Sequence, residues 1–276
     1  MRMELHCHTT HSHGTKVYYD GVNTPEEIVK GAKAKGLDAI VITDHNTMFG
    51  ANEAVKYAKK YSVLVIKGEE ISSAGGDITA LGIQEVIRPK LNAEETIDRI
   101  HQQGGIAVAV HPFAIKEIGL GEKSSVCDAV EVFNSLSIDR LANRRARKFA
   151  ERMNLNMVAG SDAHCREMLG NGMTIVKADS EEGALKAIRK GRTEIEARHT
   201  PLNVMKALAI RRLSMSYDYT MKYIMQNYWG PKKYISKKML PLVKRSPGNV
   251  DYLFGLMSYI SFGGVLFYGL GKNLGR

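Results

Sequence analysis

The chain has 276 residues, 44% of them apolar, which is enough for one large domain with an appendage or for two modest domains. This composition excludes a wholly disordered protein. Three scattered cysteines are too few for a disulfide framework, so a reduced, cytoplasmic location is expected. Glu4, His6 and His8 interrupt any apolar run at the start, so no signal peptide is expected.

The net charge of +10 is concentrated near the C-terminus. Residues 1–200 hold 27 of the 39 Lys and Arg and 27 of the 29 Asp and Glu, so the charges there cancel. Residues 201–276 hold the other 12 basic residues and only two acids, Asp218 and Asp251. This asymmetry indicates an anionic partner for the basic segment, either a membrane surface or nucleic acid, unless the segment is simply solvated.

Short apolar runs alternate with amphipathic stretches over the first 200 residues. In chain order they predict a strand at 3–8, a helix at 25–36, strands at 39–43, 63–67 and 78–81, a helix at 92–103, strands at 106–110 and 129–133, a helix at 140–153 and a strand at 156–159. The first helix has a clear start, with Thr24 as N-cap and Pro25 in its first turn.

The predicted strands are nearly continuous in apolar character, which is typical of a parallel sheet covered on both faces. Seven such strands with intervening helices predict an α/β fold, a closed or nearly closed β/α barrel, with an open doubly wound sheet as the alternative. The pattern changes after residue 192, and the Thr200-Pro201 pair is a plausible boundary. We therefore expect a catalytic domain at 1–200 and a basic, mostly helical extension at 201–276.

Histidines and acids follow several of the predicted strands. His6 and His8 are two residues apart on the first predicted strand, so their side chains face the same way and can bind one ion. Four further motifs close later strands: Thr43-Asp44-His45, Gly68-Glu69-Glu70-Ile71-Ser72, Val110-His111-Pro112 and Gly160-Ser161-Asp162-Ala163-His164. In β/α folds the carboxyl ends of the strands form the rim where active sites are built, so these residues are expected to converge.

The number and chemistry of these side chains indicate a centre with more than one ion. Imidazole mixed with carboxylate suits zinc, manganese or iron, and the absence of cysteine pairs argues against a structural zinc site. We therefore predict two or three divalent ions.

The set HxH…H…TDH…GEEIS…HP…GSDAH, in this order, resembles the polymerase and histidinol phosphatase (PHP) superfamily of metal-dependent phosphoesterases. The resemblance covers roughly residues 1–200. It implies a distorted seven-stranded β/α barrel, in agreement with the strand count above. It also implies a phosphoesterase of the phosphatase type.

The resemblance implies three metal positions. His6, His8 and Asp162 would hold one ion, and Glu70 would bridge it to a second ion that His111 also binds.

The third ion would be held by His13, His45 and His164, although many family members have Asp where His13 stands. Asp77 stands where the family often has a histidine ligand for the second ion, and it departs from the pattern there. The residues expected to be catalytic as well as ligating are His6, His8, Glu70, His111, Asp162 and His164.

The mechanism expected from such a site is attack on phosphorus by a metal-bridged hydroxide, with the ions neutralising the phosphate oxygens. Arg144, Arg145 and Arg166 are candidate phosphate contacts, and Asn134 at the end of its strand could touch substrate.

Residues 252–270 form a stretch of 19 without a charge, just long enough to cross a bilayer. The alternatives are a helix lying on an anionic membrane, with the Lys and Arg pairs before it docking on lipid, or a helix buried in the protein or an oligomer interface. If membrane contact occurs, the flanking charges favour attachment at the inner face.

The hydrolysis of a small phosphate monoester or nucleotide is the first functional hypothesis. A nuclease that uses the basic tail to hold DNA or RNA is an alternative, although no nucleic-acid motif is present. A non-catalytic membrane adaptor that retains a metal site is the hypothesis from another class.

Overall fold

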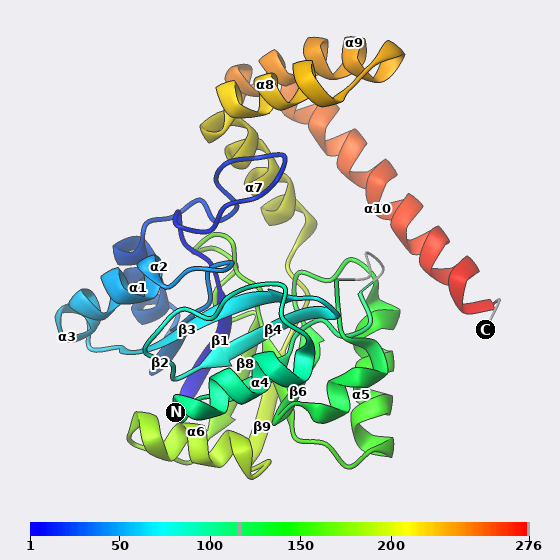
Figure 1. Ribbon diagram of the computed structural model, residues 1–276. Helices are drawn as coiled ribbons and strands as arrows, with labels where there is room; N and C mark the ends of the chain where they lie inside the picture. The colour runs from blue at the N-terminus through cyan, green and yellow to red at the C-terminus, as the bar shows by residue number, and fades with distance from the viewer. Residues whose placement is uncertain (115–117, 275–276) are drawn as a thin grey trace.

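The computed structural model describes residues 1–114 and 118–274. Over this part of the chain, nine strands form one sheet that curls into a nearly closed barrel, with helices outside it and a helical extension above it (Figure 1). The strands are β1 Arg2–Cys7, β2 Ala39–Ile42, β3 Leu64–Ser73, β4 Gly76–Leu81, β5 Ile106–Ala109, β6 Ala129–Asn134, β7 Met157–Gly160, β8 Gly172–Val176 and β9 Thr193–Ala197. Their order is β7-β6-β5-β4-β3-β2-β1-β8-β9.

The barrel-like α/β fold is confirmed, but the prediction of seven strands was wrong by two. The sequence reading missed β8 and β9, which pair with each other in antiparallel register. β7, at one end of the sheet, contacts β8 and β9 at the other side of the barrel through side-chain hydrogen bonds. Thr174 Oγ1 donates to the carbonyl of Ala159, and Thr193 Oγ1 donates to the carbonyl of Met157.

The sheet is mixed rather than parallel throughout. β1, β2 and β3 are parallel to one another, as are β5, β6 and β7. β4 runs antiparallel to both of its neighbours, and β8 runs antiparallel to β1. The reason for the first reversal is the connection between β3 and β4, which consists of Ala74 and Gly75 alone. Two residues can close a hairpin, whereas a parallel crossover needs about a dozen or more.

Helices α1 Pro25–Ala34, α2 Phe49–Ala54, α3 Ala58–Tyr61, α4 Ala93–Gln102 and α5 Arg140–Arg152 cover the outside of the barrel (Figure 1). The first begins with a capping box between Thr24 and Glu27, as its sequence predicts. Helix α6, Glu181–Arg189, lies below the barrel, and its Ile188 packs with Met3, Leu5 and Ile66 of the interior. The lower end of the barrel is therefore closed, and the site lies at the other end.

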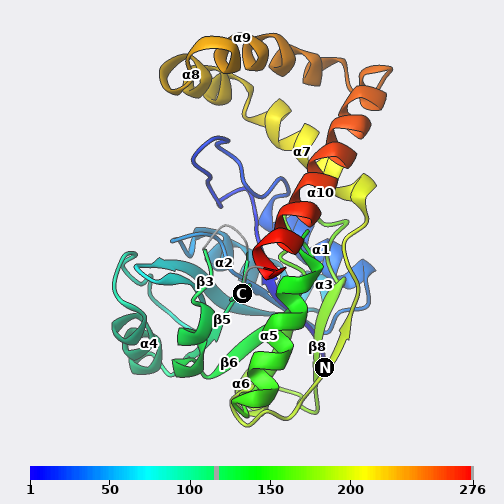
Figure 2. The same ribbon diagram turned by 90° about the vertical axis from the view of Figure 1, so that its right-hand side faces the viewer.

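The extension consists of α7 Leu202–Met215, α8 Tyr217–Asn227, α9 Gly230–Met239, a short 3₁₀ helix Leu240–Arg245 and α10 Val250–Leu274. It rises above the barrel, and α10 returns toward it (Figures 1 and 2). The loop between β1 and α1 contacts α8, since Thr220 Oγ1 donates to the carbonyl of Lys16. Among the described residues, no helix combines the length and the apolar character that a membrane span requires.

Candidate metal centre

Histidines and carboxylates converge at the upper end of the barrel, as the spacing of the motifs predicts. Eight of the nine predicted ligands lie in four overlapping groups whose ligand atoms are within 4.8 Å of one another. These eight are His6, His8, His45, Glu70, Asp77, His111, Asp162 and His164. They come from β1, β3 and β4 and from the segments that follow β1, β2, β5 and β7.

Glu70 lies at the middle of this cluster. Its Oε2 is 3.2 Å from Nε2 of His6 and 3.3 Å from Nε2 of His8. The same oxygen is 3.2 Å from Nδ1 of His45, and Oε1 is 3.0 Å from Nε2 of His111. Two atoms that bind one ion at about 2.1 Å are about 3.0 to 3.4 Å apart in octahedral or tetrahedral geometry. The spacing around Glu70 therefore fits shared coordination.

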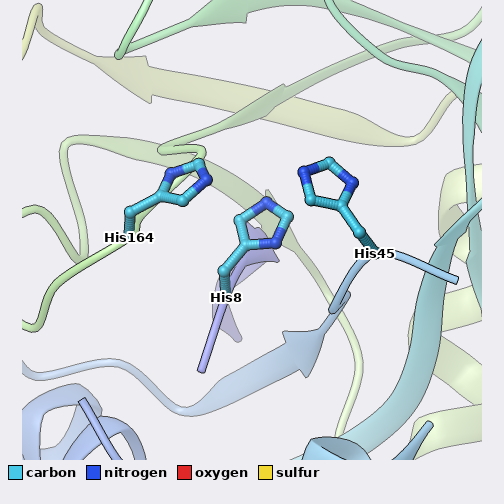
Figure 3. Close-up of side chains that lie close together, drawn as sticks. All are labelled: His8, His45 and His164. Atoms are coloured by element: carbon cyan, nitrogen blue, oxygen red, sulfur yellow. The ribbon is translucent and has the colours of Figure 1, made fainter. Parts of the chain in front are cut away.

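Asp162 is a second carboxylate that lies close to several histidines. Its Oδ1 lies 3.3 Å from Nε2 of His8 and 3.3 Å from Nδ1 of His164. Nε2 of His6 is slightly farther away, at 3.6 Å. The rings of His8, His45 and His164 lie side by side, with His8 between the other two (Figure 3). His8 and His164 are stacked with their centroids 4.1 Å apart.

Asp20 is a member of this cluster that the sequence analysis missed. Its Oδ2 lies 2.8 Å from Nε2 of His164 and 3.4 Å from Nε2 of His45. These contacts lower the pKa of the Asp20 carboxyl well below its usual value, although burial opposes the shift. Asp20 is therefore ionised and faces the two histidines that were expected to share an ion with His13.

His13 itself does not join the cluster. It is exposed, its Nδ1 lies 3.1 Å from the carbonyl of Tyr18, and its ring stacks on that of Tyr18. The chain reverses between Ser12 and Asp20, because the amide of Asp20 donates to the carbonyl of Ser12. This reversal brings residue 20 back to the site and carries residues 13–19 away from it. Asp20 thus lies beside His45 and His164, where His13 was expected, and His13 does not.

Asp77 on β4 lies with Glu70 and His111. It is half-buried, and burial together with the Glu70 charge raises the pKa of its carboxyl to about 6. A cation at this position would therefore relieve the repulsion between two neighbouring carboxylates. The position where the sequence departs from the family pattern still offers an oxygen ligand.

The protonation state of His8 fits metal binding. Burial, together with the neighbouring His164, lowers the pKa of His8 to about 3, so its imidazole is neutral near pH 7. Its Nε2 is buried with no partner in hydrogen-bonding geometry, yet it lies 3.3 Å from both Glu70 and Asp162. Metal binding requires the neutral form of an imidazole, and the neutral His8 ring meets this requirement.

His45 shows the complementary effect. Burial opposes its imidazolium, but Glu70 and Asp20 outweigh burial and raise the pKa of His45 to about 10. The surrounding carboxylates thus favour positive charge at this point, and bound divalent ions would supply it in place of protons.

Glu131 on β6 orients two of the histidines. Its Oε1 is 3.1 Å from Nδ1 of His6, and its Oε2 accepts the backbone N–H of His111 at 2.8 Å. A carboxylate on the other nitrogen fixes the ring orientation and raises the basicity of a ligating imidazole. Gly160 allows this arrangement, since a Cβ there would lie 2.6 Å from the Cβ of His6 and would overlap Glu131 Oε1.

The backbone around the site is also specialised. The register of β1 against β2 shifts by one residue between Glu4 and Cys7, which is a bulge. Bulges re-aim side chains, and here Leu5 packs in the barrel interior while His6 still reaches the site. His111 and Asp162 have φ values of 33° and 49°, in the left-handed region that non-glycine residues seldom adopt.

Of the three arginines predicted to contact phosphate, two form ion pairs with other acids and one is exposed to solvent. Arg145 pairs with Asp139 at 3.1 Å, Arg166 pairs with Glu167 at 3.2 Å, and Arg144 is exposed. The arginine that reaches the site is Arg212 on α7. Its Nη2 lies 2.8 Å from Oδ1 of Asp20.

Asn134 lies on the rim as expected, but it binds protein groups. Its Nδ2 donates to Glu131 Oε2 and to Asp162 Oδ2. It therefore positions these two carboxylates.

The chain is similar to several known proteins. A family model described as PHP-associated matches residues 140–193. An uncharacterised protein of Methanocaldococcus jannaschii is 40% identical over 152 residues, which cover 53% of this chain and 89% of that protein. A 5'-3' exoribonuclease of Haemophilus influenzae is 36% identical over 95 residues, which cover 33% of this chain and only 32% of that enzyme.

Among solved structures, the chain resembles a two-domain protein of Bacteroides vulgatus that contains a predicted PHP-like metal-dependent phosphoesterase. The TM-score is 0.58 at 20% identity, covering 76% of this chain and 69% of that one. At this identity the match shows a shared fold. Taken with the motif order and the PHP-associated match, it shows that the chain resembles PHP-like metal-dependent phosphoesterases in fold.

Proposed function

We propose that this chain hydrolyses a phosphate monoester or a small nucleotide with two or three divalent ions held at the end of the barrel. The observation that carries the proposal is the environment of Glu70. Its two oxygens lie within 3.3 Å of ring nitrogens from four histidines. A carboxylate in this position suits the bridging ligand of a centre with more than one ion.

We assign the ligand atoms to three sets, and Glu70 and Asp162 each also lie close to a histidine of a neighbouring set. In this proposal the first ion takes His6, His8 and Asp162, the second takes Glu70, Asp77 and His111, and the third takes Asp20, His45 and His164.

Zinc, manganese and iron all suit this mixture of nitrogen and oxygen. The nearby thiols are poor competitors, since Cys7 Sγ donates to the carbonyl of Val41 and burial raises the pKa of Cys165 to about 12.

Bound ions would make a water molecule acidic enough to supply the nucleophile and would neutralise the phosphate oxygens. The chain's own residues hold the ligands in place and bind the substrate. Arg212 brings a guanidinium to the rim, where it would contact a phosphate oxygen while it holds Asp20. Glu131 and Asn134 fix His6 and Asp162.

Phosphate release from monoesters and nucleotide release from oligonucleotides, both by the full chain, test this proposal and its nuclease alternative, which the likeness to the exoribonuclease favours. The substrates would be nucleoside monophosphates, nucleotide bisphosphates, histidinol phosphate and short oligonucleotides, each with Mn²⁺ or Zn²⁺. His111→Ala should abolish turnover, whereas His101→Ala, which changes an exposed histidine on α4, should not.

Turnover of monophosphates supports a phosphatase. Turnover of oligonucleotides alone, falling steeply with added salt, would favour the nuclease. Bound ions without any turnover would favour the non-catalytic adaptor.

We propose further that the extension contacts an anionic membrane surface from one side. Trp229, Tyr252, Ile260 and Phe267 are each at least 65% exposed, and such side chains favour the membrane interface. The excess of basic residues in 201–276 would add attraction to anionic lipid.

Sedimentation with phosphatidylglycerol vesicles tests the membrane contact, with phosphatidylcholine vesicles as the control. We expect binding to the former that weakens in a Lys232→Glu, Lys233→Glu variant. Self-association without vesicle binding would instead assign these side chains to an interface between copies of the chain.

A further inference from the structure

A pocket of about 350 Å³ lies beside the metal centre, and both the barrel and the extension line it. His111 and Asp162 of the centre contribute to its wall, as does Arg212 of α7. The volume falls in the range of small-molecule sites, ~300–1,000 Å³. A substrate whose phosphate contacts the ions would place its alcohol group in this pocket.

The rest of the lining is mainly apolar. Leu136 and Ile138 come from the segment between β6 and α5, and Ile118 comes from the segment before β6. Val265 comes from α10, which descends from the top of the extension toward the barrel (Figure 2). Four aliphatic side chains from three separate segments therefore surround the space next to the ions.

We propose that this pocket binds the alcohol group of the substrate and that the substrate is a phosphate monoester of an apolar alcohol, aromatic or alkyl, a substrate class that rests on the proposed hydrolase activity. Arg212 supplies the cation for the phosphate, and Val265 supplies one wall for the alcohol. The extension is thus part of the substrate site.

The polar groups of the lining are already engaged, which argues against a sugar in the pocket. Ser137 Oγ donates to the carbonyl of Asp139. The carboxylate of Asp139 accepts the backbone N–H of Leu141 and pairs with Arg145.

Asn134 is engaged in the same way, because its Oδ1 accepts the backbone N–H groups of Leu136 and Ser137. Its Nδ2 is bound to two carboxylates of the site. Among the described lining residues outside the metal centre, the side-chain hydrogen-bond donors other than those of Arg212 therefore already have acceptors. A polar alcohol would lose hydrogen bonds to water on entry, whereas an apolar alcohol would gain from burial.

Arg212 can serve the phosphate in addition to Asp20. Its Nη2 is buried and, although it is 2.8 Å from Asp20 Oδ1, it has no acceptor in hydrogen-bonding geometry. A phosphate oxygen would satisfy it. The same residue lines the pocket, so phosphate and alcohol would be bound side by side.

The test measures binding separately from turnover. The Mn²⁺-loaded full chain would be titrated with phenylphosphonate and methylphosphonate, which share the anionic group but differ in the apolar group. Hydrolysis of 1-naphthyl phosphate and glycerol phosphate would be measured in parallel. We expect phenylphosphonate to bind about tenfold or more tightly than methylphosphonate, and the same preference in kcat/KM for the naphthyl ester.

Val265→Asp should remove this preference by placing a charge in the wall. Val265→Trp, which fills the pocket without a charge, should weaken phenylphosphonate more than methylphosphonate. Phe267→Asp is the matched control, because it places the same charge on the same helix at a side chain that is 81% exposed.

Equal binding of the two phosphonates by the unaltered chain, or a preference that survives both Val265 variants, would overturn the inference. Binding of neither phosphonate would also overturn it. Turnover without a preference would refute the pocket inference alone. A preference without any turnover would keep the pocket and refute the hydrolase proposal.

Discussion

Replacing Asp20 with asparagine removes the negative charge that faces His45 and His164 while keeping the size of the side chain. In the proposed ligand set, Asp20 is the carboxylate that would bind the third ion and neither of the other two. We therefore expect Asp20→Asn to lose that ion and to keep the other two. His13→Ala is the matched control, because His13 is exposed and rests against Tyr18.

The size of the effect follows from the lost ligand. Losing a partner of a ligand typically weakens metal affinity about 10- to 100-fold, so losing an ionised ligand should cost at least ~100-fold. An ion present at 100 times its Kd stabilises the folded chain by ~2.7 kcal/mol, and an ion at its Kd by only ~0.4 kcal/mol. The difference of about 2.3 kcal/mol corresponds to about 5 to 9 °C of Tm for a protein of this size.

The assay compares the rise in Tm on adding Mn²⁺ and the metal content after gel filtration. The rise in Tm is compared rather than the Tm itself, because Asp20 also pairs with Arg212 and its loss changes the metal-free protein. Asp20→Asn should show the smaller rise and one ion fewer per chain, whereas His13→Ala should match the unaltered chain. Loss of an ion in His13→Ala with none lost in Asp20→Asn would refute the assignment.

Three other substitutions test residues that pack around the metal centre and hold its side chains in place. Glu131→Gln keeps one acceptor oxygen of two, so metal affinity should fall about 10- to 100-fold in calorimetric titrations, and unchanged affinity would show that His6 is oriented without it. Gly160→Ala should lower the free energy of unfolding by ~1–3 kcal/mol in urea, because its Cβ overlaps Glu131 and crowds His6, and a variant as stable as the parent would contradict this packing. Burial raises the pKa of Glu4 from 4.5 to about 7, so the folded state holds the proton more tightly and loses stability as pH rises from about 4.5 to 7. Glu4→Gln should remove this part of the pH dependence, and identical pH profiles of unfolding would argue that Glu4 is ionised throughout.

Most of the site could be predicted because its residues follow strands. When histidines and acids follow several strands of a curled sheet, the strand ends bring them together whatever the details of the connections. His8, His45, His111 and Asp162 are of this kind. The two-residue spacing of His6 and His8 was sufficient to place both rings on one side.

The residues that were missed owe their positions to tertiary structure. Asp20 lies in a loop without periodicity, and tertiary contacts such as the hydrogen bond from its amide to Ser12 and the ion pair with Arg212 hold it at the rim. Glu131 stands inside a strand where nothing local distinguishes it from a buried acid of another kind. Arg212 belongs to the extension, which the change in composition suggested was separate from the site.

Strand β9 was missed because of its local sequence. The segment Thr-Glu-Ile-Glu-Ala at 193–197 alternates as a half-buried strand should, but its charged residues hid it from a search for apolar runs. The direction of β4 could have been inferred from the short link between β3 and β4, since no parallel crossover fits two residues.

Stepwise metal addition tests the central claim most directly. The full chain would be stripped with a chelator, Mn²⁺ would be added in measured equivalents, and phosphate release from 1-naphthyl phosphate would be followed at each step, with Glu70→Gln in parallel. We predict no activity without metal, a rise that saturates at two or three equivalents, and no activity of Glu70→Gln at any equivalent. Hydrolysis that persists without metal, or that Glu70→Gln retains in full, would contradict the account.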